Sequence, residues 1–114
     1  MSDEIAEARE VEIETNADGR TYRTVIWVIT DGDDVFVRSV RGNAGKWYQR
    51  TVANPDVALL LGDRRADYVA VPASDDESIG LVSARIRERY PPSRSVDAMV
   101  HPDVLHTTMR LDPV

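Results

Sequence analysis

Residues 21–40 read TYRTVIWVITDGDDVFVRSV and contain two apolar runs separated by a short acidic turn. In the first run, apolar residues stand at odd and even positions alike, which is typical of a strand covered on both faces. The second run is also rich in β-branched residues, and the DGDD between the runs has the glycine and aspartates of a tight turn. The segment therefore predicts a β-hairpin.

Further strands and two helices are expected around this hairpin. Apolar patterning predicts strands at 11–15, 57–61, 66–71 and 105–111, helices at 46–53 and 74–89, and a mixed connection over 93–103. These elements do not alternate as a doubly wound α/β chain would. We therefore predict a mainly β (α+β) fold, in which a six-stranded antiparallel sheet closes into a small barrel with two inserted helices.

The length of 114 residues indicates one domain. We expect that domain over residues 11–114, after an N-terminal helix or tail over residues 1–10. A net charge of −6 at pH 7 disfavours a nucleic-acid partner. No apolar run approaches the roughly 20 residues that cross a bilayer, and the acidic N-terminus does not resemble a signal peptide. We therefore expect a cytoplasmic protein with no membrane partner.

The sequence contains no pattern typical of a metal site or of a hydrolytic triad. Cysteine is absent, and the aspartates after residue 30 lack the spacing of a calcium loop. His101 and His106 lack both helical spacing and a third zinc ligand. Ser39 has no convincing histidine and acid partners in the sequence. We expect no metal, and no catalytic residue is assigned.

The stretch VRSVRGNAGKWY, residues 37–48, is the best candidate for binding a ligand. It contains three cations, two glycines and two adjacent aromatics. A strand that passes a glycine toward a helix exposes hydroxyl and amide donors, and the cations add charges suited to phosphate. The alternative is a solvated hairpin tip whose arginines balance Asp33 and Asp34, with the aromatics simply in the core.

Arg20 and Arg23 form a second candidate group. If strand 21–30 pairs with 35–40 through the turn, Arg23 lies at the end of the hairpin far from the turn, near Ser39 and Arg41. Two strands would then contribute cations to one place. The alternative is a surface ion pair.

From about Val11 to Pro113 the chain resembles the flavin-binding split-barrel superfamily, which includes the pyridoxamine phosphate oxidases and the deazaflavin-dependent nitroreductases. Segments 37–48 and 107–113 (TTMRLDP) look most like a small bacterial and archaeal branch labelled only as a domain of unknown function. The positions that match the nitroreductase pattern are Gly19, Arg20, Arg23, Ser39, Arg41, Gly42, Trp47, Tyr48, Ala53, Asn54 and Pro55.

This resemblance implies a split-barrel homodimer that binds flavin mononucleotide or a deazaflavin at the subunit interface, and an oxidoreductase that passes hydride to a small acceptor. The cofactor-binding residues that it implies are Arg20, Arg23, Val37, Arg38, Ser39, Arg41, Gly42, Lys46 and Trp47, with Tyr90 on the substrate side. Two departures favour an alternative, a non-catalytic small-ligand-binding or accessory dimer. The loop has one glycine where the superfamily has two together, and Ser93 and Val96 replace expected tyrosines.

Overall fold

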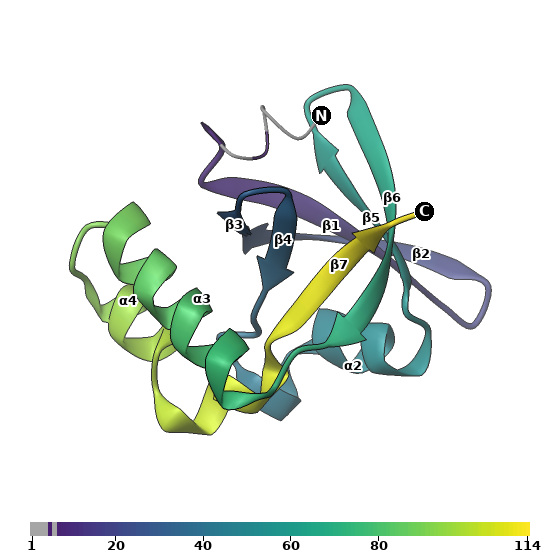
Figure 1. The fold of residues 1–114 in the computed structure, drawn as a ribbon. Helices are drawn as coiled ribbons and strands as arrows, with labels where there is room; N and C mark the ends of the chain where they lie inside the picture. The colour runs from purple at the N-terminus through teal and green to yellow at the C-terminus, as the bar shows by residue number, and fades with distance from the viewer. Residues whose placement is uncertain (1–4, 6) are drawn as a thin grey trace.

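One curled antiparallel sheet, with helices on one side and at one end, makes up the protein (Figure 1). The computed structural model describes residue 5 and residues 7–114, so the predicted helix or tail over residues 1–10 lies partly outside the described residues. The strands are β1 (Glu10–Ala17), β2 (Arg20–Trp27), β3 (Ile29–Asp31), β4 (Asp34–Val37), β5 (Asp56–Leu61), β6 (Arg64–Pro72) and β7 (Met109–Pro113). The helices are α2 (Lys46–Ala53), α3 (Asp76–Arg89) and α4 (Arg94–Met99), with 3₁₀ helices at Gly42–Ala44 and Pro102–Thr107.

The order of strands in the sheet is β2-β1-β5-β6-β7-β4-β3, and every neighbouring pair is antiparallel. Strands β2 and β3 are thus the two edges of the sheet, yet only Val28 separates them in the chain. The sheet must curl until its two edges meet. Among the described residues no backbone ladder joins β2 to β3 or β4, so the barrel is split at that place.

The predicted mainly β, antiparallel split barrel is confirmed, with seven strands in place of six. The expected strand 21–30 is broken at Val28, so its first part pairs with β1 and only its last part forms the hairpin with β4. The break has a physical reason, because Val28 is buried in one hydrophobic cluster and Ile29 in another. The apolar residues on both faces of this run therefore serve two different cores.

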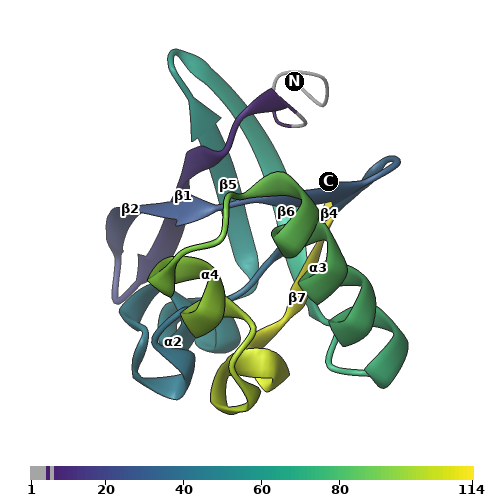
Figure 2. The ribbon, with the colours of Figure 1, turned by 90° about the vertical axis from the view of Figure 1, so that its left-hand side faces the viewer.

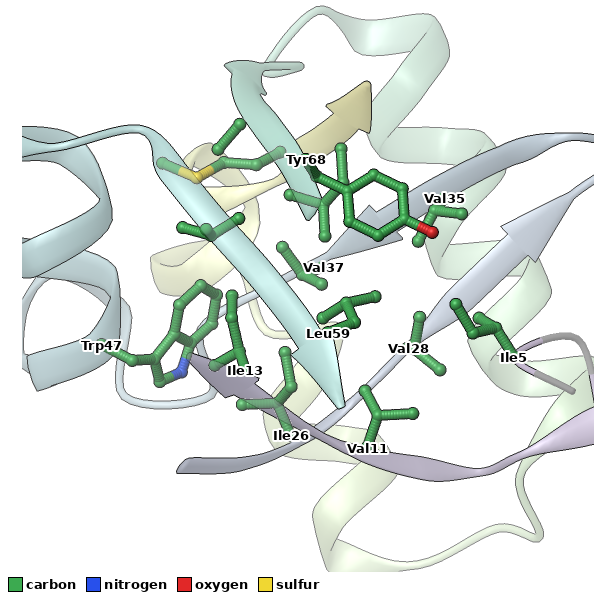
Figure 3. Packing of buried hydrophobic residues seen from close by; sticks show 14 residues of the cluster. Ile5, Val11, Ile13, Ile26, Val28, Val35, Val37, Trp47, Leu59 and Tyr68 are labelled. Atoms are coloured by element: carbon green, nitrogen blue, oxygen red, sulfur yellow. The ribbon is translucent and has the colours of Figure 1, made fainter. Parts of the chain in front are cut away.

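The first cluster fills the barrel, and the second lies between the sheet and the helices. In the barrel, Ile13 and Leu59 are cross-strand partners and both are fully buried. Figure 3 shows Trp47 of α2 beside Ile13 at one end of this cluster and Ile5 near Val28 at the other. In the second cluster, buried side chains of α3 and α4 pack against Phe36 of β4 and Ile29 of β3. Helices α3 and α4 lie side by side in both views (Figures 1 and 2).

The connection before the last strand is more helical than expected, since it contains α4 and the second 3₁₀ helix. The strand predicted over 105–111 begins only at Met109. Thr107 and Thr108 donate their hydroxyl hydrogens to the carbonyls of Val104 and Leu105. Such local bonds compete with a backbone ladder and favour the 3₁₀ turn. None of the helices formed by described residues is long and apolar enough to span a bilayer.

Tyr90, which follows α3, joins three parts of the molecule. Its ring stacks on Trp27 of β2 with centroids 3.9 Å apart and planes 6° apart. Its hydroxyl lies 2.5 Å from the carbonyl oxygen of Arg9 and 3.3 Å from that of Val28. Burial raises the pKa of Tyr90 to about 12, so the hydroxyl remains a donor at neutral pH. Tyr90 therefore fixes the segment before β1 and the β2–β3 junction to the end of α3.

We expect Tyr90→Phe to lower the free energy of unfolding by about 1–3 kcal/mol, because the carbonyls of Arg9 and Val28 lose their donor while the ring stack is kept. Urea unfolding measures the change. Tyr48→Phe, whose ring packs edge-on against Trp47, is the matched control and should cost less than about 0.5 kcal/mol. Equal costs for the two variants would contradict the role of the Tyr90 hydroxyl.

Candidate functional site

A cavity of about 510 Å³ lies between β2 and the segment that leads from β4 to α2. Small-molecule sites typically have volumes of roughly 300–1,000 Å³. The lining residues are Glu10 at the start of β1, Thr24, Val25, Ile26 and Trp27 of β2, Arg38, Ser39, Val40, Arg41, Gly45, Lys46 and Trp47 of the β4–α2 segment, and Ser95 and Met99 of α4. The split in the barrel is therefore the candidate binding site.

The cavity brings together five of the nine residues predicted to hold a cofactor. These five are Arg38, Ser39, Arg41, Lys46 and Trp47, whereas Arg20, Arg23, Val37 and Gly42 do not line it. Val37 is fully buried in the barrel core. The contribution of each of the nine to ligand binding stays a prediction.

The pairing on which the predicted placement of Arg23 beside Ser39 and Arg41 depends is wrong, since β4 pairs with β3 and β7 and not with β2. The predicted strand is interrupted at Val28, and its first part, β2, pairs with β1. Arg23 therefore lies opposite Glu14. Its Nε lies 3.5 Å from Glu14 Oε1, and the buried Glu14 carboxylate also binds Arg65. The surface ion pair is therefore the arrangement that the structure shows. Arg20 lies at the other end of β2 from the cavity-lining residues.

Arg38, at the exit of β4, is only 2% exposed and donates four hydrogen bonds inside the protein. Its Nε donates to Thr108 Oγ1 at 2.8 Å, and one terminal nitrogen donates to Ser83 Oγ at 2.9 Å and to the Met99 carbonyl at 3.0 Å. The other terminal nitrogen donates to the Ile79 carbonyl at 3.2 Å. Arg38 thus links the end of β4 to α3, to the last residue of α4 and to the segment before β7.

All four acceptors of Arg38 are neutral, and it forms no ion pair with a carboxylate among the described residues. Burial, and secondarily repulsion by Arg87, lowers the pKa of Arg38 to about 10, which leaves it charged at neutral pH. A buried cation without an opposite charge is unfavourable for folding. The wall of the cavity therefore contains a fixed positive charge to which no carboxylate of the described residues is paired.

The next residue, Ser39, holds the loop in shape. Its backbone N–H donates to Thr107 Oγ1 at 3.0 Å, and its hydroxyl donates to the Gly42 carbonyl at 2.9 Å. Gly42 has φ of +59°, which favours glycine, and Gly45 packs directly against Ser39 Oγ. The Ser39 hydroxyl hydrogen is therefore used within the loop, and the residue is 1% exposed.

The lining of the cavity combines cationic and apolar groups. Helix α2 begins there after Gly45, and no side chain caps its first amides, so its N-terminus offers free N–H groups to an anion. Arg41 and Lys46 are exposed beside it. Val25 and Val40 line the cavity although they are 59% and 48% exposed. Only Glu10 contributes a carboxylate to the described lining.

Tyr90, predicted for the substrate side, does not line the cavity. Its ring stacks on the indole of Trp27, and Trp27 does line the cavity. Its predicted contact with substrate stays a prediction, and the structure gives it a supporting position behind the wall.

The contributions of β2 and α4 to the cavity were not predicted from the sequence. The expectation that strand 21–30 is covered on both faces fails at Val25, which is largely exposed at the cavity. The long apolar run was the available signal, because a surplus of apolar residues on a strand indicates a second contact surface. Ser95 and Met99 had no local signal, since only the packing of α4 brings them to the cavity.

The chain has the split-barrel fold, as its similarity to solved structures shows. HutZ, the heme storage protein from Vibrio cholerae, is 19% identical, with a TM-score of 0.77 over 98% of this chain and 87% of that chain. The FAD binding protein from Mycobacterium smegmatis is 15% identical, with a TM-score of 0.69 over 98% and 86%. An F420-H2 dependent reductase (FDR-A) is 17% identical, with a TM-score of 0.69 over 91% and 94%.

Residues 2–111 match the family described as "Uncharacterized protein conserved in bacteria (DUF2255)", and the chain belongs to that family. A comparison with the curated proteins finds no match. The low identities to the solved structures establish the fold alone.

We expect Gly45→Ala to destabilise the protein by about 1–3 kcal/mol, since the new methyl group would collide with the buried Ser39 hydroxyl. Gly80→Ala is the control, because Gly80 lies in α3 and, apart from its chain neighbours and the backbone of its own helix, nothing lies within 4 Å of the place that its new methyl group would take. That change should stabilise the helix by about 0.5–1 kcal/mol. Thermal unfolding of both variants checks the pair, and a Gly45→Ala protein as stable as wild type would refute the close packing of this loop.

Proposed function

We propose that this protein binds a flavin-type cofactor, flavin mononucleotide or a deazaflavin, in the cavity at the barrel split. The observation that carries the proposal is that Arg38, Arg41, Lys46 and the uncapped α2 N-terminus line one cavity together with apolar side chains. This occurs in a chain whose net charge is −6. The similar FAD binding protein and F420-H2 dependent reductase support the same ligand class.

The chemistry of the lining residues fits such a cofactor. Arg41, Lys46 and the first amides of α2 would hold its phosphate, because charged donors and helix N-termini bind phosphate well. Val25, Val40 and Trp27 would cover its flat ring and exclude water. When bound, the cofactor supplies hydride chemistry, and the chain supplies binding and orientation. On this proposal the protein is an oxidoreductase that acts on a small acceptor.

A non-catalytic ligand-binding protein is the second candidate, and one observation favours it. Among the described residues that line the cavity, Glu10 is the only carboxylate and no histidine or tyrosine is present, so the lining has few of the side chains that most often act as general acids and bases. Mixing the protein with reduced flavin or deazaflavin and a panel of small acceptors separates the candidates. Oxidation of the cofactor faster than in the absence of protein supports the enzyme, whereas tight binding without turnover supports the binding protein.

We expect Arg41→Ala to weaken binding of flavin mononucleotide by about 1.5–3 kcal/mol, the range for hydrogen bonds to charged groups. Quenching of tryptophan fluorescence measures binding, since Trp27 and Trp47 both line the cavity. Arg64→Ala removes the same charge at an exposed position of β6 that does not line the cavity, and it should leave the affinity unchanged. A titration of wild type with flavin mononucleotide, flavin adenine dinucleotide, deazaflavin and haem comes first. Failure of all four to bind, or equal affinities of the two variants, would refute the proposal.

We further propose that the protein is a homodimer in which a second copy covers the mouth of the cavity. The exposed Val25 and Val40 support this, since two β-branched apolar side chains lie open beside the proposed site. We expect Val25→Lys to shift the protein to monomer in light scattering coupled to size-exclusion chromatography. Val52→Lys is the control, because Val52 is 60% exposed on α2 and does not line the cavity. A monomeric wild type, or a Val25→Lys dimer as stable as that of the control, would contradict the arrangement.

A further inference from the structure

We infer that Arg38 sets the charge preference of the ligand site from within its wall, as a positioning residue and fixed counter-charge for an anion. The inference rests on the proposed function for the place of the ligand, and it assigns Arg38 a role different from that of Arg41 and Lys46. Those two residues are exposed and free to contact a ligand directly, whereas Arg38 is 2% exposed.

The hydrogen bonds of Arg38 fix its position. Acceptors on three separate segments hold the guanidinium, namely Ser83 and Ile79 of α3, Met99 of α4, and Thr108 before β7. A guanidinium held by four bonds does not turn into the cavity without losing several of them. Arg38 therefore acts on a ligand through its charge and through the loop that it positions.

That charge has no local compensation among the described residues. The α3 residues that face it are a serine, a main-chain carbonyl and another cation, Arg87. The bonds from α4 and from the segment before β7 come from a carbonyl and a hydroxyl. An anion in the cavity would supply the missing negative charge. Through an interior of moderate dielectric constant, one unit charge changes anion affinity on the order of tenfold.

The ionic-strength dependence of binding distinguishes Arg38 from the exposed cations. Exposed charges are screened within about 10 Å at 0.1 M salt, whereas a buried charge is screened much less. Arg41 and Lys46 should therefore contribute the part of the affinity that salt weakens. Arg38 should contribute a part that persists as salt is raised.

The decisive variants are Ser83→Asp and Ser83→Asn, which differ only in charge at the position 2.9 Å from the guanidinium. Ser83→Asp gives Arg38 an internal counter-charge, and Ser83→Asn keeps the contact neutral. Ala84→Asp adds the same charge at the next, exposed position of α3 and controls for net charge. The probes are flavin mononucleotide, riboflavin, which has the same ring without phosphate, and inorganic phosphate.

We expect Ser83→Asp to bind flavin mononucleotide roughly tenfold more weakly than Ser83→Asn, with a loss that persists at about 0.5 M salt. Riboflavin should bind both variants equally, and Ala84→Asp should bind flavin mononucleotide like wild type. Equal binding of flavin mononucleotide by the two Ser83 variants, or an equal loss for riboflavin, would overturn the inference. If Ser83→Asp does not fold, Arg38→Lys should keep the preference for flavin mononucleotide over riboflavin and Arg38→Gln should lose it.

Inorganic phosphate separates this inference from the proposed cofactor. If wild type binds no flavin but phosphate stabilises Ser83→Asn and not Ser83→Asp, the cofactor proposal fails and the role of Arg38 stands. If flavin mononucleotide binds both Ser83 variants equally, the role of Arg38 fails and the cofactor proposal stands. If wild type responds to neither probe, both fail.

Discussion

The Arg38 guanidinium joins segments that are far apart in the sequence, because its hydrogen bonds reach Ser83 on α3, the end of α4 and Thr108 before β7. Burying this cation without a carboxylate costs stability, and its neutral acceptors offset only part of that cost. An apolar residue would avoid that cost but would leave the acceptors on α3, on α4 and before β7 without this donor. Arg38 also fixes where the β4–α2 loop starts, and hence where Arg41 and the first turn of α2 lie.

A second constraint decides that a cavity exists there at all. The two edge strands of the sheet are separated in the chain by Val28 alone, so the curled sheet brings β2 close to β3 without room for another strand. The side of β2 that faces away from β1 remains unpaired in a backbone ladder among the described residues. The β4–α2 loop lies opposite it, and the space between them becomes the cavity. The place of the site thus follows from the connectivity of the sheet, whereas its charge follows from the loop.

Much of the fold could be predicted from local patterns, and the errors have a common cause. Alternation and turn residues indicate strands correctly, yet they do not show which of two cores a buried side chain joins. The run through Val28 and Ile29 therefore resembles one strand, and that interpretation places Arg23 in the wrong hairpin. Within the loop, the sequence does not separate the buried Arg38 from the exposed Arg41. The partners that bury Arg38 lie 45 and 70 residues away, and no pattern in the loop itself indicates them.

The glycines of the β4–α2 loop bear on whether the proposed anion site, formed by Arg41, Lys46 and the first amides of α2, is complete. The resemblance to the superfamily suggests a deficit, because the loop has one glycine where two adjacent ones are usual. In the structure two separate needs are each met by one glycine. Gly42 supplies the positive φ of the turn, and Gly45 gives the close approach to Ser39 that starts α2 with its amides uncapped. A second adjacent glycine would add flexibility without adding a donor, since each residue has one backbone N–H whatever its side chain. The glycine pattern is therefore no argument against the proposed anion site. The case for a non-catalytic protein depends instead on the scarcity of acid–base groups in the cavity.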